Sequence, residues 1–128
     1  MKLNFSWEES AWVPVPNCIS TVINTDGVSP LDCILTDDGG QNFLDTLSWL
    51  DEGLNRIKSV KDASVDSAEW SRDAWGAELT KEQAKIYSLH DEEYFEILSI
   101  DSFAAALLAW RNFLQLEPKS KLPQEIEI

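Results

Sequence analysis

The chain has 128 residues, 23 of them acidic and 10 basic, which gives a formal net charge of −13 at pH 7. This length predicts a single domain, and a hydrophobic content of 44% is enough to form a buried core. The negative charge argues against binding to nucleic acids or anionic membranes, because both carry negative charge themselves.

The first 38 residues are expected to form strands and turns. Residues 2–8 alternate apolar and polar side chains, which is the pattern of a half-buried strand. The prolines of Val13–Pro16 cannot donate to a sheet interior, so this segment is expected to be an edge strand or an extended connector. The β-branched run Cys18–Asn24 predicts another strand, and Leu31–Leu35 is compatible with a further short one.

A helix is predicted over residues 41–60. Either Asp37 or Asp38 is expected to cap its start, and basic residues near its end suit the helix dipole. Trp49 lies off the apolar stripe, so it either packs under a neighbouring loop or faces a partner. The stripe consists of Phe43, Leu44, Leu47, Leu50, Leu54 and Ile57.

Residues 74–100 are predicted to form three antiparallel strands, because only short turns separate their apolar segments. The strands are Ala74–Thr80, Ala84–Leu89 and Tyr94–Ile100. A second helix is predicted over residues 101–117, where Asp101 or Ser102 is the expected N-cap and Pro118 ends the helix. Its core-facing stripe consists of Phe103, Leu107, Trp110 and Leu114.

These elements together predict one α+β domain over residues 1–118. Its mainly antiparallel sheet would end in a C-terminal three-strand meander, with two amphipathic helices packed on it. Residues 119–128 are expected to be a loose tail, with the alternative that Ile126 and Ile128 pair at a sheet edge.

The cysteines and the histidine show no catalytic or metal-binding pattern. Cys18 and Cys33 lack the spacing of zinc ligands or a redox pair, so they are expected to be buried free thiols, with a disulfide as the alternative. His90 stands in a polar turn, where a solvated side chain is commoner than a general base. Since the sequence holds no catalytic motif or phosphate-binding loop, no enzyme activity, cofactor or metal site is expected.

A cytoplasmic location is expected from three features. The longest apolar run, Phe103–Trp110, is far shorter than the roughly 20 residues of a membrane span. Residues 1–8 lack the apolar segment of a signal peptide. Free thiols persist in a reducing compartment.

The negative charge is spread over the predicted strands and turns. Residues 1–55 and 62–101 each carry −8, whereas residues 56–61 carry +3 and residues 102–128 are neutral. Because no like-charge run is longer than Asp91–Glu93, the charge belongs to a folded surface rather than to an acidic tail. Such a surface serves either solubility alone or the docking of a basic partner, whose association it would accelerate.

Six tryptophans are many for this length, and tryptophan is enriched where protein interfaces have their strongest contacts. Trp70 has charged neighbours in the sequence, so it either packs locally or anchors a cationic partner surface. The residues expected to bind a partner are Trp70 and nearby acids, the acids of the turn after residue 89, and those before the first helix. They are Asp37, Asp38, Glu69, Trp70, Asp73, Glu78, Asp91, Glu92 and Glu93.

A run of core motifs in the C-terminal half is similar to that of a known family. The run consists of Trp75–Leu79, Ile86–Leu89, Tyr94–Leu98 and then Phe103, Ala106, Leu107, Trp110, Phe113 and Leu114. Over residues 70–116 the chain resembles small bacterial immunity proteins of polymorphic toxin systems, including those of contact-dependent growth inhibition. The resemblance implies a cytoplasmic inhibitor that binds one cognate toxin, often a nuclease. It implies no particular binding residues, because such proteins place their interfaces differently.

The leading hypothesis is an immunity protein that neutralises a basic toxin domain, most simply a nuclease. Nucleases hold phosphate with lysine and arginine, so an acidic surface can occlude their substrate groove. The alternative is a small acidic adaptor or regulatory module that binds another host protein, and a DNA mimic is a variant of the first idea. A monomer is favoured, with no direct contact to nucleic acid or membrane.

Overall fold

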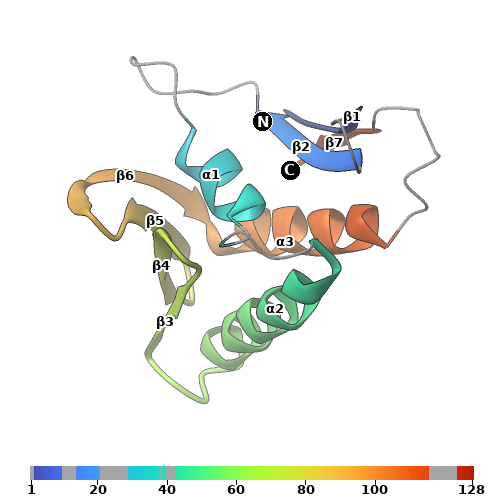
Figure 1. The fold of residues 1–128 in the computed structure, drawn as a ribbon. Helices are drawn as coiled ribbons and strands as arrows, with labels where there is room; N and C mark the ends of the chain where they lie inside the picture. Colours follow the sequence, from blue (N-terminus) through green and yellow to red (C-terminus); the bar gives the residue numbers. More distant parts are fainter. Residues whose placement is uncertain (1, 10–13, 21–28, 38, 40–42, 116–123) are drawn as a thin grey trace.

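The structure is a computed structural model that describes residues 2–9, 14–20, 29–37, 39, 43–115 and 124–128. Its elements follow one another in the order β1, β2, α1, η1, α2, β3, β4, β5, β6, α3 and β7. Two antiparallel sheets and the helices make up the fold (Figure 1), so the predicted α+β class is confirmed. Residues of both sheets and of the helices belong to one hydrophobic core.

The N-terminal strands form a three-stranded sheet. The central strand β1 (Lys2–Glu9) lies between β2 (Pro14–Ser20) and β7 (Gln124–Glu127), and both neighbours are antiparallel to it. β2 is an edge strand, as its prolines require, and residues 21–24 of the predicted second strand lie outside the described residues. Ile126 lies opposite Leu3, so the expectation of a loose tail is wrong for residues 124–127, and the edge-pairing alternative is confirmed for Ile126 but not for Ile128, which follows the end of β7.

A four-stranded antiparallel meander forms the second sheet. It has one strand more than the three predicted. The additional strand, β3, is not indicated by the sequence because it is short and only Ala68 and Trp70 are apolar in it. The strands follow one another in sequence and in space as β3 (Ser67–Ser71), β4 (Trp75–Thr80), β5 (Gln83–Ser88) and β6 (Asp91–Ser99).

The expectation of a short strand at Leu31–Leu35 is wrong, because α1 (Pro30–Thr36) is a helix. Its N-cap is Ser29, whose hydroxyl accepts from the Asp32 N–H at 3.2 Å, and Pro30 occupies the first turn, where proline is favoured. From β6, the Glu96 carboxylate accepts a hydrogen bond from the Leu31 N–H at 3.1 Å. This contact with a distant strand adds to the local helix-start signals of Ser29 and Pro30 in a helix of only seven residues.

The two predicted helices are present with different caps. The first begins as a 3₁₀ turn, and Thr46 stands at the N-cap of α2 without a side-chain cap bond. The second is capped by Ser99, whose hydroxyl accepts from the Ser102 N–H at 3.1 Å, rather than by Asp101 or Ser102. The elements are η1 (Phe43–Thr46), α2 (Leu47–Lys61) and α3 (Ile100–Leu114).

The helix α3 joins the two sheets through aromatic contacts, and its predicted core stripe is buried as expected. In Figure 1 it runs between the three-stranded sheet and α2. On one side, the ring of Phe5 from β1 lies 5.1 Å from that of Trp110 and 5.3 Å from that of Phe113, measured between centroids. On the other side, the ring of Phe103 lies 6.2 Å from that of Trp70 in β3.

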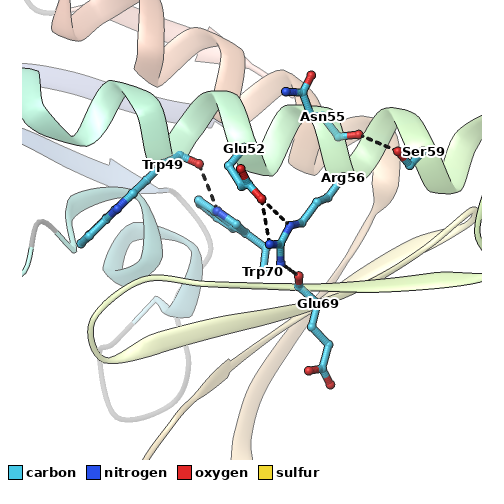
Figure 2. Close-up of polar contacts among 7 residues, drawn as sticks. All are labelled: Trp49, Glu52, Asn55, Arg56, Ser59, Glu69 and Trp70. Atoms are coloured by element: carbon cyan, nitrogen blue, oxygen red, sulfur yellow. Dashed lines mark hydrogen bonds and ion pairs between the residues drawn. The ribbon is translucent and has the colours of Figure 1, made fainter.

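Trp70 also fixes the four-stranded sheet against α2. Its indole N–H donates to the carbonyl oxygen of Trp49 at 3.0 Å (Figure 2), and its ring lies against Gly53. A Cβ atom added at Gly53 would lie only 2.9 Å from Cε2 of the ring. The sheet and α2 can therefore approach this closely only because residue 53 has no side chain.

We expect Gly53→Ala to destabilise the protein, although alanine favours a helix by about 1 kcal/mol over glycine. The added methyl group would overlap the Trp70 ring, and overpacking of this kind costs about 1–3 kcal/mol. Thermal unfolding measures the effect, with Asn55→Ala at an exposed position of α2 as the control. If Gly53→Ala were as stable as the native protein, the close packing described here would be wrong.

Glu96 makes the stability of the fold dependent on pH. Burial raises the pKa of its carboxyl group, the hydrogen bond from Leu31 lowers it, and the charge of Asp32 raises it further. A carboxyl group whose pKa is higher in the folded than in the unfolded state favours folding when protonated. The free energy of unfolding should therefore fall as the pH rises from the unfolded-state pKa of this carboxyl group to its folded-state pKa. Above the folded-state pKa, the destabilisation by the buried carboxylate charge has reached its full size.

The variant Glu96→Gln removes this charge and keeps an acceptor for the Leu31 N–H. We expect it to be at least as stable as the native protein at neutral pH, with the difference shrinking as the pH falls below the ordinary pKa of glutamate. Denaturant unfolding at several pH values measures this, with Glu93→Gln at an exposed position of β6 as the control. A lower stability of Glu96→Gln at neutral pH would contradict the expectation.

Candidate partner-binding surface

The four-stranded sheet has one covered and one open face. Successive side chains of a strand point to opposite faces, so burial of Trp70, Leu79 and Ile86 on the helix side places their neighbours on the other side. No described helix or strand lies over that side (Figure 1). We call it the open face, and the side chains that form its centre are Glu69, Glu78, Lys85, Tyr87, Phe95 and Ile97.

The strand register arranges these side chains in two rows across the sheet. From β3 to β6, the first row is Glu69, Glu78, Lys85 and Ile97. From β4 to β6, the second row is Gly76, Tyr87 and Phe95. The open face is therefore acidic over β3 and β4 and apolar over β6.

Glu69 and Glu78 lie directly opposite each other, an arrangement in which like charges destabilise a sheet. Arg56 does not neutralise Glu69, because its guanidinium donates to the backbone carbonyl of Glu69 and forms an ion pair with Glu52 at 2.8 Å. The Glu69 carboxylate points away from α2 (Figure 2). Within the described part of the chain, neither Glu69 nor Glu78 forms an ion pair.

Glu92 joins these two acids around a shallow polar pocket of about 220 Å³, which Lys85 and Tyr87 also line. Three carboxylates surround one lysine there, so the pocket retains negative charge. A cationic group placed in it would relieve the repulsion between Glu69 and Glu78. The pocket is thus suited to an arginine or lysine side chain of another molecule.

Tyr87 reaches the pocket because Gly76 lies beneath its ring. A Cβ atom at Gly76 would lie 3.1 Å from Cζ and 3.2 Å from the hydroxyl oxygen of Tyr87. Burial raises the pKa of the Tyr87 hydroxyl, and the charges of Glu69, Glu92 and Glu78 raise it further. The phenol therefore stays protonated at neutral pH and offers both an O–H donor and an aromatic ring to a ligand.

Phe95 and Ile97 form the apolar part of the open face. They are 43% and 49% exposed, and they are neighbours on the same face of β6. The ammonium of Lys85 lies 4.6 Å from the centroid of the Phe95 ring, in cation–π geometry. Neighbouring exposed apolar side chains of this size are typical of binding surfaces.

The open face brings together three of the predicted partner-binding residues, which are Glu69, Glu78 and Glu92. Asp91 and Glu93 are exposed on either side of Glu92 in the sequence, at the start of β6, but they are not among the residues that line the pocket. Asp73 is exposed in the turn between β3 and β4.

Two predicted binding residues have structural roles instead. Trp70 is only 3% exposed and belongs to the core, so its assignment as a surface anchor is wrong. Asp37 is half-buried, and its carboxylate accepts from the backbone N–H groups of Ala74 at 2.7 Å and Trp75 at 3.2 Å. It therefore holds the start of β4 rather than capping α2, while Asp38 lies outside the described residues.

The prediction from sequence missed Tyr87, Phe95 and Ile97 as surface residues. A signal for them is present in Tyr94–Leu98, where large apolar side chains occur at both odd and even positions. A strand with this pattern is typically covered on both faces. In this structure the helices cover only one face, so the second set of apolar side chains is left exposed.

The two cysteines are free thiols, as expected, but only Cys18 is fully buried. Its thiol donates to Oδ1 of Asp32 at 3.4 Å, and burial together with the charge and hydrogen bond of Asp32 raises its pKa far above the ordinary value. Cys33 is half-buried, and burial followed by the charges of Asp32 and Asp37 raises its pKa. Thiols of this kind are poor nucleophiles at neutral pH.

His90 is exposed in the turn between β5 and β6, as predicted. The described residues contain no group of three or more histidine, cysteine or acidic side chains that could hold a metal ion. None of the helices in the described ranges has the length and apolar character needed to cross a membrane. Comparisons with family models, curated proteins and solved structures find no match to this chain.

The electrostatic clustering on the open face can be measured without a partner. We expect Glu69→Gln combined with Glu92→Gln to lower the pKa of Tyr87, because two of the charges that raise it are removed. Absorbance of the tyrosinate during alkaline titration reports this pKa, with Tyr94→Phe as the background that leaves Tyr87 as the one tyrosine in the chain.

The matched control is Glu125→Gln combined with Asp45→Gln, which removes the same charge from exposed positions outside the four-stranded sheet. It should leave the pKa of Tyr87 close to its starting value. An equal shift in both variants would mean that the carboxylates do not converge on Tyr87.

Proposed function

We propose that the protein is an immunity-type inhibitor that binds and neutralises a basic toxin domain, with a nuclease as the expected target. One observation carries the proposal: the open face combines clustered carboxylates with exposed aromatic and aliphatic side chains. Solubility is served by charge alone and is reduced by exposure of Phe95 and Ile97. A surface that holds both features is better explained by a partner that carries cationic and apolar groups.

The chemistry of a nuclease fits the acidic part of this face. Such enzymes hold phosphate with lysine and arginine, and carboxylate oxygens accept the same charge-assisted hydrogen bonds. Glu69, Glu78 and Glu92 would take the place of phosphate groups, and the rest of the sheet would cover the substrate groove. Inhibition then requires no chemistry from the inhibitor itself.

The net charge of −13 supports the same role through kinetics. Complementary charge accelerates association by on the order of 10–1000-fold at low salt. An inhibitor of a toxin benefits from speed, because damage continues until the complex has formed. The protein would act in the cytoplasm as a monomer, without contacting nucleic acid or a membrane.

The resemblance to immunity proteins over residues 70–116 supports the proposal, because that range includes the strands β4–β6 and helix α3. A small acidic adaptor could use the same face, and the identity of the partner separates the two functions. Co-purification of the tagged protein from its native host, followed by mass spectrometry, identifies that partner. We expect a protein with a basic toxin domain whose toxicity is relieved by co-expression of this chain. A partner that is not toxic would favour the adaptor.

With the recovered partner, we expect Glu69→Lys combined with Glu78→Lys to slow association about tenfold or more at low salt. Reversal of Asp91, Glu92 and Glu93 to lysine should also slow it. Stopped-flow or biosensor kinetics at several salt concentrations measure the effect, which should diminish as salt screens the charges.

The control for the first variant is Asp45→Lys combined with Glu125→Lys, which changes the net charge equally at exposed positions outside the four-stranded sheet. Its association should slow much less. Unchanged association of the open-face variants, together with no salt dependence, would rule out the electrostatic mechanism.

A further inference from the structure

We infer that Phe95 and Ile97 anchor the complex, and that the partner presents an apolar group roughly 10–14 Å from its cationic group. This inference rests on the function proposed above and concerns which part of the open face supplies the affinity. The acidic part would govern mainly the rate of association, and the apolar part the lifetime of the complex.

The distance follows from the order of the strands. Glu69, Glu78 and Ile97 belong to one cross-strand row, in which Lys85 stands between Glu78 and Ile97. Neighbouring strands lie about 4.8 Å apart, so about 10 Å separates the β4 and β6 positions and about 14 Å separates those of β3 and β6. A partner that satisfies both ends must carry its cationic and apolar groups at that separation.

The division of roles follows from solvation. Glu69 and Glu78 are exposed at an open pocket, and such charges contribute more to association rate than to affinity. Phe95 and Ile97 still expose large fractions of their apolar surface, which a partner can remove from water. Aromatic residues in a well-covered part of an interface are the usual source of binding energy.

Lys85 connects the two parts of the face. Its ammonium sits over the Phe95 ring, although three carboxylates line the same pocket. The ring therefore already attracts a cation within this chain. A partner arginine that enters the pocket would meet both the three carboxylates and the aromatic ring of Tyr87, all of which line it.

The occupant of this face is a basic partner rather than a second copy of this chain. Two copies placed face to face would bring the carboxylates of Glu69, Glu78 and Glu92 together, and like charges at an interface cost several kcal/mol. An anionic membrane is disfavoured for the same reason. Charge complementarity therefore selects a protein surface with arginine or lysine beside an apolar group.

A helical peptide with arginine and leucine side chains at a fixed separation tests this arrangement. Seven residues of helix span about 10.5 Å, so arginines in one turn and leucines two turns later on the same side match the required separation. A second peptide of identical composition places the leucines on the opposite side of the helix. Amide NMR titrations of the isotope-labelled protein give the affinity for each peptide and the residues that respond.

We expect the matched peptide to bind more tightly than the mismatched one and to shift the signals of Phe95 and Ile97. Phe95→Thr combined with Ile97→Thr should weaken binding of the matched peptide about tenfold or more, while its salt dependence persists. Threonine keeps a high β propensity, so the strand is retained. The matched control is Ile19→Thr, at an apolar β2 position that is 57% exposed.

Two results overturn the inference in different ways. If both peptides bind equally and the threonine variant changes nothing, while Glu69→Lys combined with Glu78→Lys abolishes binding, the apolar anchor is wrong and the acidic docking function stands. If neither peptide binds, and capture of the native partner is unaffected by those charge reversals, the open face is not the docking surface and the inference is wrong. The separate result that contradicts the proposed function is a recovered partner that is not toxic.

Discussion

The packing of Trp70 between α2 and α3 is the contact on which the orientation of the four-stranded sheet depends. Its indole fills the space beside Gly53 and meets Phe103 of α3, so one side of β3 is held toward the core. Strand alternation then directs Glu69 outward, and the register of β3 to β6 extends that orientation across the sheet. A slip of one residue would exchange Glu69 with Trp70 and bury a carboxylate at a large cost in free energy.

The face created in this way is unfavourable for the isolated protein. Glu69 and Glu78 repel each other across two strands, and Phe95 and Ile97 remain in contact with water. Sequences depart from locally favourable choices mainly at functional sites. A partner with cationic and apolar groups removes both costs at once, whereas solvent removes neither. This balance links the core contact of Trp70 to the proposed binding function.

Elements with long periodic patterns could be predicted from the sequence, and helix α3 is present with its core stripe buried as expected. The short elements α1 and β3 could not, because α1 is held by a hydrogen bond that its Leu31 N–H donates to Glu96, 65 residues away, and β3 depends on the space at Gly53. For the binding surface, acidic candidates could be chosen by residue type alone. Their convergence with Tyr87 depends on strand register, which the local pattern does not indicate. Asp37 is occupied by hydrogen bonds from the backbone of Ala74 and Trp75, which are also long-range contacts.

Hydroxyl-radical footprinting of the protein, free and bound to the partner recovered by co-purification, tests most directly whether the open face is the contact surface. It reports the solvent access of individual side chains, and Phe95, Leu108 and Ile19 expose similar fractions on three different elements, at 43%, 50% and 57%. We predict that the partner protects Phe95 and Tyr87 from oxidation, while Leu108 of α3 and Ile19 of β2 stay as reactive as in the free protein. Protection of Leu108 or Ile19 with Phe95 still reactive would contradict this account.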